Sequence, residues 1–339
     1  MELAISQRDT DILLKERNLL KTEVLEKYRL SGQIAQTTLK YVIELINNSY
    51  HLGKRSQPFS AAEICLLGDS FMSSLLQNAY KNSSIREKGI AQPVTLDVND
   101  IVIGYSPEID DGVNLFFQPG DIVSIGLGCQ IDGYTSNVSH TLVIYPQGIQ
   151  DGETGELKPT GPLLGSSADA ICAAHIATET VIALLGANLT PEKIPDSISK
   201  NKVVNGTLIR SIVDSIAKSY NCIVVPTSKV RRIRRFLAGQ AEGVVAERDF
   251  KGVVWSEADQ ERQLLERTEN INNENNNNSK VQELIKFDNS KSNTTTNASS
   301  AIPSDDFVPI AGEVYSVDIK MASIEELNNE PEMFQFHIN

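Results

Sequence analysis

The stretch from Gly120 to Val143 constrains the fold of this 339-residue chain more than any other part of the sequence. At its centre, Asp132-Gly133 is typical of a type I′ hairpin turn, because both central positions of that turn take positive φ. The turn pairs Ile131 with Tyr134 and thereby fixes every other pair along the two strands. One face of the predicted hairpin is then mostly apolar and faces a core. The other face is small, polar and uncharged, which suits the lining of a cleft.

Composition limits the kind of protein this is. Lysine and arginine number 31 against 44 aspartate and glutamate residues, which gives a net charge of −13. This balance excludes general coating of nucleic acid but leaves room for a local basic patch. Apolar residues make up 40% of the chain, so we expect a globular protein with a packed core. We expect no signal peptide, no apolar run near the ~20 residues of a membrane span, and no membrane partner.

Side-chain patterns predict mostly helices around the hairpin. Helical periodicity runs from about Thr10 to Asn48. The capping box Ser60-Ala-Ala-Glu63 starts a second helix that reaches about Tyr80, and a charged connection follows over residues 81–93. Further helices are expected over Ser166–Leu185, from Thr190-Pro191-Glu192 onward and over Asn205–Tyr220, before a short buried strand at Cys222–Val225. Cys65, Cys129, Cys172 and Cys222 are expected to be buried free thiols, and His140 and His175 to be core residues.

The hairpin resembles the metal-binding hairpin of the methionine-aminopeptidase-like family, the pita-bread peptidases of family M24. That family reads roughly Asp-Phe-Gly on the first strand, with a second Asp on the facing strand, and the two carboxylates bridge two divalent ions. Gly126 and Asn137 occupy the two aspartate positions at the family's spacing. The resemblance implies an α/β (α+β) pita-bread fold of antiparallel sheets covered by helices, incomplete at its C-terminus.

Two more segments resemble functional segments of the same family. Residues 101–107 resemble the segment that reads Ala-His-Tyr-Thr-Pro in active aminopeptidases, with Gly104 in place of the substrate-binding histidine. Residues 310–319 resemble a strand in which Asp318 occupies the position of a metal-binding glutamate. The family's last metal-binding glutamate has no counterpart before Asn339, so we expect either a fragment or a truncated relative.

The family's metal-binding histidine is expected just after Pro226, where this chain instead carries a basic block. The block comprises Lys229, Arg231, Arg232, Arg234 and Arg235. Two interpretations stay open: a solvated helix face, or a contact with an anion or with the phosphates of ribosomal RNA. After it, residues 261–306 form an Asn/Ser/Thr-rich tract that is expected to be a disordered insertion. The predicted domain organisation is therefore one fold over 1–260, continued at 307–339.

Chemistry follows from these substitutions. Activation of water by a metal needs a bound cation. Gly104, Gly126 and Asn137 have replaced substrate-binding or metal-binding residues of the family, so Asp318 is the one carboxylate left at these family positions. We therefore expect no metal, no cofactor, no catalytic residue and no peptidase activity. The competing hypothesis is an active metallo-aminopeptidase whose atypical metal site is completed by residues beyond this sequence. A third is a peptide-binding module unrelated to ribosomes.

Two non-catalytic branches of the family resemble this chain: the proliferation-associated (ErbB-binding) branch and a fungal pre-ribosome export branch. The Asn-rich insertion, the basic block and the N-terminal segment Met1–Asp11 fit the second better. That resemblance implies binding to the pre-60S ribosomal particle near the peptide exit tunnel, with contacts to rRNA and exit-tunnel proteins. It also implies nuclear-pore repeat proteins and a small adaptor protein as partners. It further implies shuttling between nucleus and cytoplasm, with the nucleolus as a further compartment.

Overall fold

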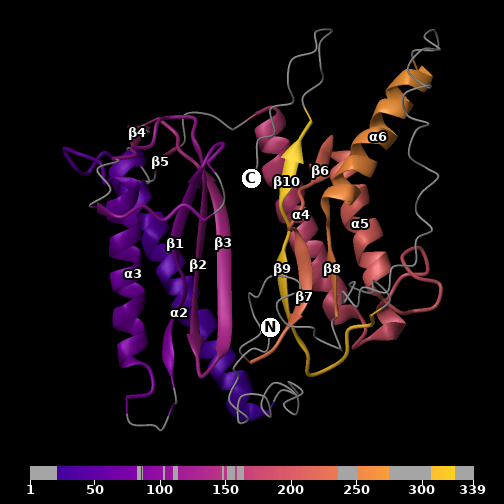
Figure 1. Cartoon of the computed structure of the whole chain (residues 1–339), viewed down its shortest axis with the longest axis horizontal. Helices are drawn as coiled ribbons and strands as arrows, with labels where there is room; N and C mark the ends of the chain where they lie inside the picture. Colours follow the sequence, from indigo (N-terminus) through magenta and orange to yellow (C-terminus); the bar gives the residue numbers. More distant parts are fainter. Residues whose placement is uncertain are drawn as a thin grey trace, which may run out of the picture.

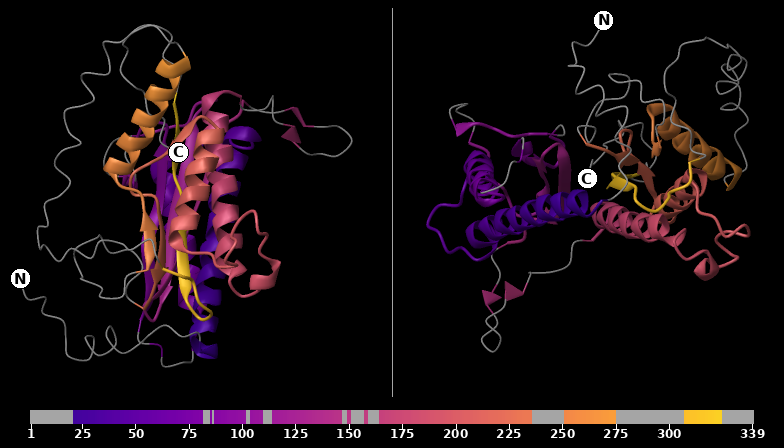
Figure 2. Two further views of the ribbon diagram at one scale, coloured as in Figure 1. Left: turned by 90° about the vertical axis from the view of Figure 1, so that its right-hand side faces the viewer. Right: turned by 90° about the horizontal axis from the view of Figure 1, so that it is seen from below.

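The computed structural model describes residues 21–81, 85, 87–101, 104–109, 114–146, 149–150, 157–158, 164–235, 251–274 and 307–324. Two lobes lie side by side (Figure 1). The first contains helices α2 (Thr22–Ile46) and α3 (Ala61–Asn78) and a three-stranded sheet. The second contains α4 (Ser166–Ala187), α5 (Gly206–Ser219), α6 (Glu257–Glu274) and short strands. Helices α2 and α4 lie on the same side of the sheets (Figure 2).

The helices of the first lobe form where their local signals predict. Helix α2 buries Ile34, Val42 and Ile46, three members of one apolar stripe. It continues into a π-helical turn, η1 (Asn47–His51). In α3 the Ser60 hydroxyl accepts a hydrogen bond from the Glu63 N–H, and the Glu63 carboxylate accepts one from the Ser60 N–H. This confirms the capping box, which satisfies two backbone donors that the helix cannot satisfy internally.

The first sheet has the order β1-β2-β3, all antiparallel. Its strands are β1 (Lys88–Val98), β2 (Ile122–Ile131) and β3 (Tyr134–Val143). The turn at Asp132-Gly133 pairs Ile131 with Tyr134, which confirms the predicted register. The predicted connection over residues 81–93 is wrong in its second half, because β1 begins at Lys88 and is interrupted by irregularities on either side of Gln92. The inward face of β2, from Val123 to Ile131, packs on α2 and belongs to the core that β1, β2, α2 and α3 share.

The second lobe is built on two antiparallel sheets, β8-β7-β9 and β10-β6. Their strands are β6 (Cys222–Val224), β7 (Lys229–Ile233), β8 (Gly252–Val254), β9 (Val314–Asp318) and β10 (Met321–Ser323). A pair of two-residue strands, β4 (Ile149–Gln150) and β5 (Leu157–Lys158), precedes this lobe. Its core joins α4 and α5 to the strands around Trp255, whose indole N–H donates to Asp214.

Three local expectations differ from the structure in this lobe. Lys229, Arg231 and Arg232 lie on strand β7, and Arg234 and Arg235 follow it directly, so the interpretation of the basic block as a helix face is wrong. The segment at Thr190-Pro191-Glu192 was expected to start a helix, but it forms only a single 3-10 turn, η3 (Pro191–Lys193). Helix α6 continues past residue 261, where the disordered insertion was expected to begin. At its start, Ser256 and Asp259 each accept a hydrogen bond from the backbone N–H of the other. Residues 275–306 of the predicted insertion lie outside the described residues.

Burial corrects three further expectations, and the length and composition of α4 correct a fourth. His140 and His175 are exposed rather than buried in a core, and so is Cys172. Cys65, Cys129 and Cys222 are buried free thiols as predicted. In the described part of the chain α4 is long and apolar enough to cross a membrane by length and composition, a test that the core helix of a soluble protein also passes. The expectation that no apolar run reaches this length is therefore wrong for α4, and the absence of a membrane partner stays a prediction.

Candidate functional site

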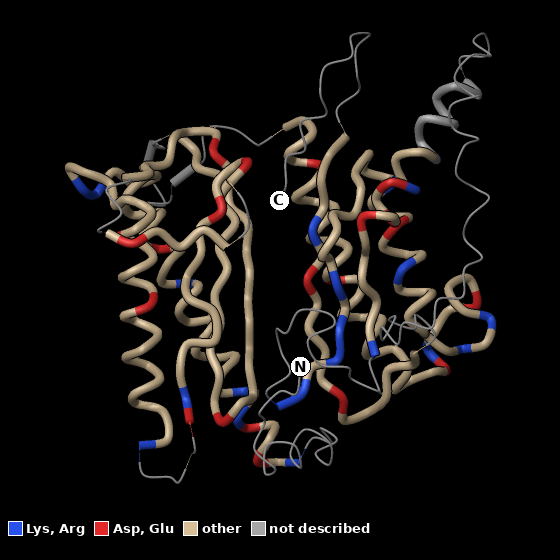
Figure 3. The backbone as a smooth tube through the Cα atoms, in the orientation of Figure 1, with Lys and Arg blue, Asp and Glu red and all other residues tan. Residues whose placement is uncertain are grey.

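The two positions that correspond to the hairpin aspartates lie together on the face of the sheet away from the core. Gly126 pairs with Ser139, and Gly128 pairs with Asn137. Because side chains alternate between faces along a strand, Gly126 and Asn137 are diagonal neighbours on one face. This is the arrangement that the hairpin turn predicts. Strand β3 carries no charged residue along its length (Figure 3).

The space beside Gly126 is already filled. A Cβ atom built on Gly126 would lie 2.7 Å from Thr95 Oγ1 and 2.9 Å from Gln92 Nε2. Both side chains come from β1, and the Thr95 hydroxyl donates to the Gly126 carbonyl oxygen at 3.3 Å. A carboxylate at this position would therefore require the Thr95 hydroxyl and the end of the Gln92 side chain to move. Gly126 offers no ligand, and the space that a ligand would occupy is taken by these two side-chain ends.

Asn137 turns its amide toward the hairpin rather than away from it. A Cβ atom built on Gly128 would lie 2.8 Å from Asn137 Cγ, so the glycine makes room for the amide. Asn137 itself is exposed. It offers one neutral carbonyl oxygen, whereas a divalent cation bound by oxygen ligands needs anionic ones to offset its desolvation.

The third substituted position, Gly104, is fixed by its backbone. Its φ is +95°, a conformation that side-chain-bearing residues rarely adopt. Its N–H and that of Tyr105 both donate to Asp97 Oδ1 at 2.8 Å. Burial raises the pKa of Asp97, although those two hydrogen bonds and the nearby charge of Lys320 act in the opposite direction. A histidine at position 104 would be strained, so the loop is built for glycine.

Asp318, at the end of β9, is the one carboxylate that persists at a family ligand position. Its Oδ2 atom lies 3.2 Å from Lys320 Nζ, and the two side chains are 31% and 21% exposed. Residues 318 and 320 are two apart on an extended segment, so their side chains leave it on the same side. Sequence reasoning did not single out Lys320, although this spacing was a usable signal.

These residues do not fit a divalent metal ion. Two of the family's carboxylate positions are neutral, the space beside one of them is occupied by the Thr95 and Gln92 side chains, and the third carboxylate is ion-paired with a lysine. Within the described ranges, no group of three or more His, Cys, Asp or Glu side chains is placed to hold a metal ion. The aminopeptidase scaffold is therefore present here without the anionic ligand set that its chemistry uses.

Two of the five residues of the basic block are buried. Arg231 and Arg232 are 9% and 8% exposed, while Lys229, Arg234 and Arg235 are partly exposed. Arg232 Nη1 lies 3.2 Å from Glu313 Oε1, and Lys251 Nζ lies 2.6 Å from the same oxygen. Burial would raise the pKa of Glu313, but hydrogen bonds from Lys251 and Tyr315 outweigh it and lower the pKa. Part of the block therefore stabilises the second lobe.

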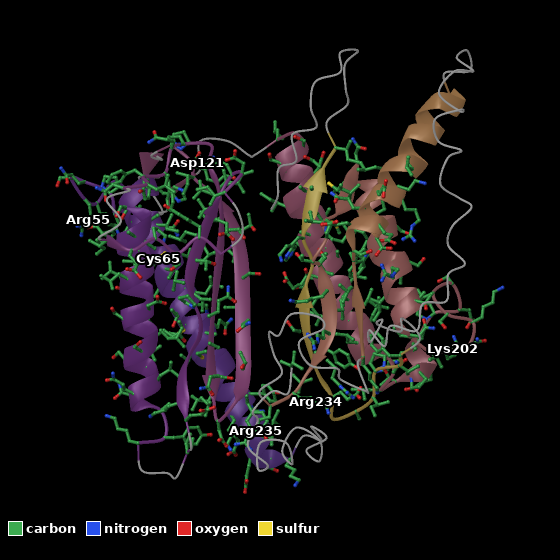
Figure 4. The ribbon with its side chains drawn as sticks, in the orientation of Figure 1. Arg55, Cys65, Asp121, Lys202, Arg234 and Arg235 are labelled. Carbon is green, nitrogen blue, oxygen red and sulfur yellow. The ribbon has the colours of Figure 1, made fainter. Side chains whose placement is uncertain are left out.

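Arg235 connects the two lobes at the base of the molecule (Figure 4). Its Nη2 and Nε atoms lie 2.6 Å from Asp132 Oδ1 and 2.7 Å from Asp132 O, in the hairpin turn of the first lobe. Lys27 Nζ, from α2, lies 2.6 Å from Asp132 Oδ2. Both cations lie 5.5 Å from the centre of the Tyr134 ring. We call these four residues the inter-lobe clasp; the sequence did not predict it.

Comparison with known proteins identifies the family of this chain. The profile of metallopeptidase family M24 matches residues 26–198. "Probable metalloprotease ARX1" of Debaryomyces hansenii is 60% identical over 328 residues, covering 96% of this chain and 56% of the relative. The protein of the same name from Saccharomyces cerevisiae is 53% identical over 343 residues, covering 96% of this chain and 55% of the relative. This chain thus spans about half the length of these relatives.

A solved structure confirms the predicted fold. "Structure of a thermophilic Arx1" is similar with a TM-score of 0.57 and 19% identity, covering 93% of this chain and 71% of that one. The mixed helices and antiparallel sheets are those expected of the α/β pita-bread fold. From the family profile and the fold together, we conclude that this chain belongs to metallopeptidase family M24.

Proposed function

We propose that this chain belongs to a non-catalytic M24 protein that binds the pre-60S ribosomal particle near the peptide exit tunnel. It would act in ribosome biogenesis and nuclear export, moving between nucleus and cytoplasm. Its partners would be rRNA, exit-tunnel proteins, nuclear-pore repeat proteins and a small adaptor protein. No metal or other cofactor takes part. The ribosomal role is supported by the resemblance to the fungal export branch, and the non-catalytic role is supported by the site.

One observation carries the non-catalytic part: the filled space beside Gly126. Loss of a ligand alone is reversible by a single substitution, but here Thr95 and Gln92 also occupy the volume that the ligand needs. Together with the neutral Asn137 and the ion-paired Asp318, this leaves no pair of carboxylates at the family's metal-ligand positions among the described residues. Water activation by a metal is therefore not the chemistry that these residues support.

We assign the rRNA contact to two partly exposed residues of the basic block, Lys229 and Arg234. Arg231 and Arg232 are nearly buried, and Arg235 belongs to the inter-lobe clasp. Lys229 and Arg234 are partly exposed, so they are the members best placed to meet a phosphate. In a protein with a net charge of −13, such contacts have to be local.

The test uses the full-length tagged protein and its Lys229→Glu/Arg234→Glu variant. Co-sedimentation with pre-60S particles is measured over a salt series, with Lys193→Glu/Lys200→Glu as a control at two exposed lysines of another loop. Each lost phosphate contact should lower the salt slope by about 1, so the first variant should bind more weakly and with a smaller slope than the control. Equal slopes would remove the assignment to this block. Absence of the wild-type protein from the particles would remove the ribosomal role.

Peptidase activity separates the proposal from its rival. The wild-type full-length protein, supplied with cobalt or manganese, should not release the N-terminal residue from short peptides. Release that depends on the metal and disappears with a chelator would establish the atypical-metal-site hypothesis instead.

A further inference from the structure

Lys320 places its ammonium group next to Asp318, the one carboxylate that persists at a family ligand position. We propose that the ammonium group of Lys320 is a built-in cation that takes the place of a metal beside Asp318 and closes this position to divalent ions. The inference rests on the non-catalytic part of the proposed function and is independent of ribosome binding.

Both the N–H and the carbonyl oxygen of Lys320 form hydrogen bonds. The Val225 N–H donates to the Lys320 carbonyl oxygen at 3.0 Å. The Ser228 hydroxyl donates to the same oxygen at 3.2 Å and accepts from the Lys320 N–H at 3.0 Å. Ser228 is fully buried, so this anchor is fixed by the core of the second lobe. The side chain of Lys320 therefore starts from a defined point next to Asp318.

Two carboxylates from different lobes lie near the ammonium group. Asp318, from β9, is in contact with it at 3.2 Å. Asp97, from β1, is close enough that the charge of Lys320 acts to lower its pKa. An arriving divalent cation would meet this fixed positive charge at the remaining family carboxylate, and like charges at contact distance in a partly buried site repel strongly. Restoring one missing ligand would therefore not restore metal binding while Lys320 keeps its charge.

This predicts a specific interaction between two substitutions. Asn137→Asp returns a carboxylate to a family ligand position, and Lys320→Gln removes the charge while keeping a side chain of similar length. The proposal predicts that wild type binds no cobalt, and that Asn137→Asp/Lys320→Gln binds cobalt at least about tenfold more tightly than Asn137→Asp (about 1.4 kcal/mol). Asn137→Asp/Lys320→Arg keeps the charge and should behave like Asn137→Asp alone.

The experiment titrates cobalt chloride into each full-length variant and follows the visible absorption of bound cobalt together with calorimetry. Asn137→Asp/Lys202→Gln is the control for loss of a lysine, because Lys202 pairs with the exposed Asp196 and not with a carboxylate of the family's ligand set. Thermal unfolding of each variant checks that it is folded. Equal cobalt affinity of Asn137→Asp and the double Gln variant, including no binding by either, would overturn the role of Lys320. Stoichiometric binding by wild type would overturn this inference and the non-catalytic function together, whereas particle association tests the ribosomal role by itself.

Discussion

The inter-lobe clasp makes a prediction that the sequence alone did not contain: Asp132 couples the stability of the two lobes. The perturbation is Asp132→Asn, which removes the charge and keeps the shape of the side chain. Asn also tolerates the positive φ of +56° at this position, so the hairpin turn is retained. What the variant loses is the charge that holds Arg235 and Lys27.

The magnitude follows from burial and from the number of contacts. Asp132, Arg235 and Lys27 side chains are 11%, 13% and 21% exposed, and each cation lies 2.6 Å from an Asp132 carboxylate oxygen. Removing one partner of a buried pair costs about 3–5 kcal/mol, whereas exposed pairs contribute about 0–1 kcal/mol. The clasp lies between these limits and nearer the first. We expect Asp132→Asn to lower the free energy of unfolding by about 2–4 kcal/mol.

The assay is urea unfolding of the full chain, with Asp132→Asn, Arg235→Gln and the double variant forming a cycle. The coupling energy between the two residues should be about 1–3 kcal/mol, and 1 M salt should leave most of it because the groups are largely shielded from solvent. Asp196→Asn is the matched control, since its carboxylate pairs with Lys202 but is 81% exposed. A coupling energy below about 0.5 kcal/mol would refute the clasp.

Three further outcomes are expected. Gly126→Asp should lower the free energy of unfolding by about 1–3 kcal/mol through overpacking without creating metal binding, whereas Gly89→Ala, with open space beside it, should change it little; equal effects in denaturant titrations would contradict the filled space. Glu313, whose pKa is lowered in the fold, contributes stability that is present above the unfolded pKa of about 4.3 and is lost as pH falls through the lower folded pKa. Urea unfolding of Glu313→Gln should therefore show a weaker loss of stability between about pH 5 and pH 3 than wild type, and identical profiles would speak against the ion-pair network. Burial raises the pKa of Cys65 to about 12, so native-state alkylation followed by mass spectrometry should modify the exposed Cys172 first; early modification of Cys65 would be inconsistent with its burial.

Local signals predicted the β2–β3 hairpin and the starts of α3 and α5 well. The turn at Asp132-Gly133 fixes the β2–β3 register through the handedness of its own backbone. The capping box at Ser60 and Glu63 starts α3, and the Asn205 side chain starts α5 by accepting from the Leu208 N–H. Each of these features depends on residues a few positions apart, so one sequence is enough to find it.

The parts that were not predicted depend on distant partners. Arg232 is buried because Glu313 lies beside it, 81 residues further along the chain. Arg235 reaches Asp132 across 103 residues and between lobes. The sequence does not show which carboxylates pair with a run of cations, so such a run is interpreted as exposed to solvent. For this reason the basic block was expected to be a helix face or an anion site. The space beside Gly126 is likewise filled from β1, through irregularities in that strand that no local pattern indicates.

The central claim, that this site does not hold a metal ion, is tested most directly by the metal content of the full-length protein. The protein is purified without chelator and its metals are measured by elemental mass spectrometry. A site with a filled Gly126 position, a neutral Asn137 and an Asp318 held by Lys320 should retain only traces of cobalt, manganese, zinc or iron, before and after incubation with each ion. A stoichiometric amount of any of these metals, lost when Asp318 is replaced by alanine, would contradict the account.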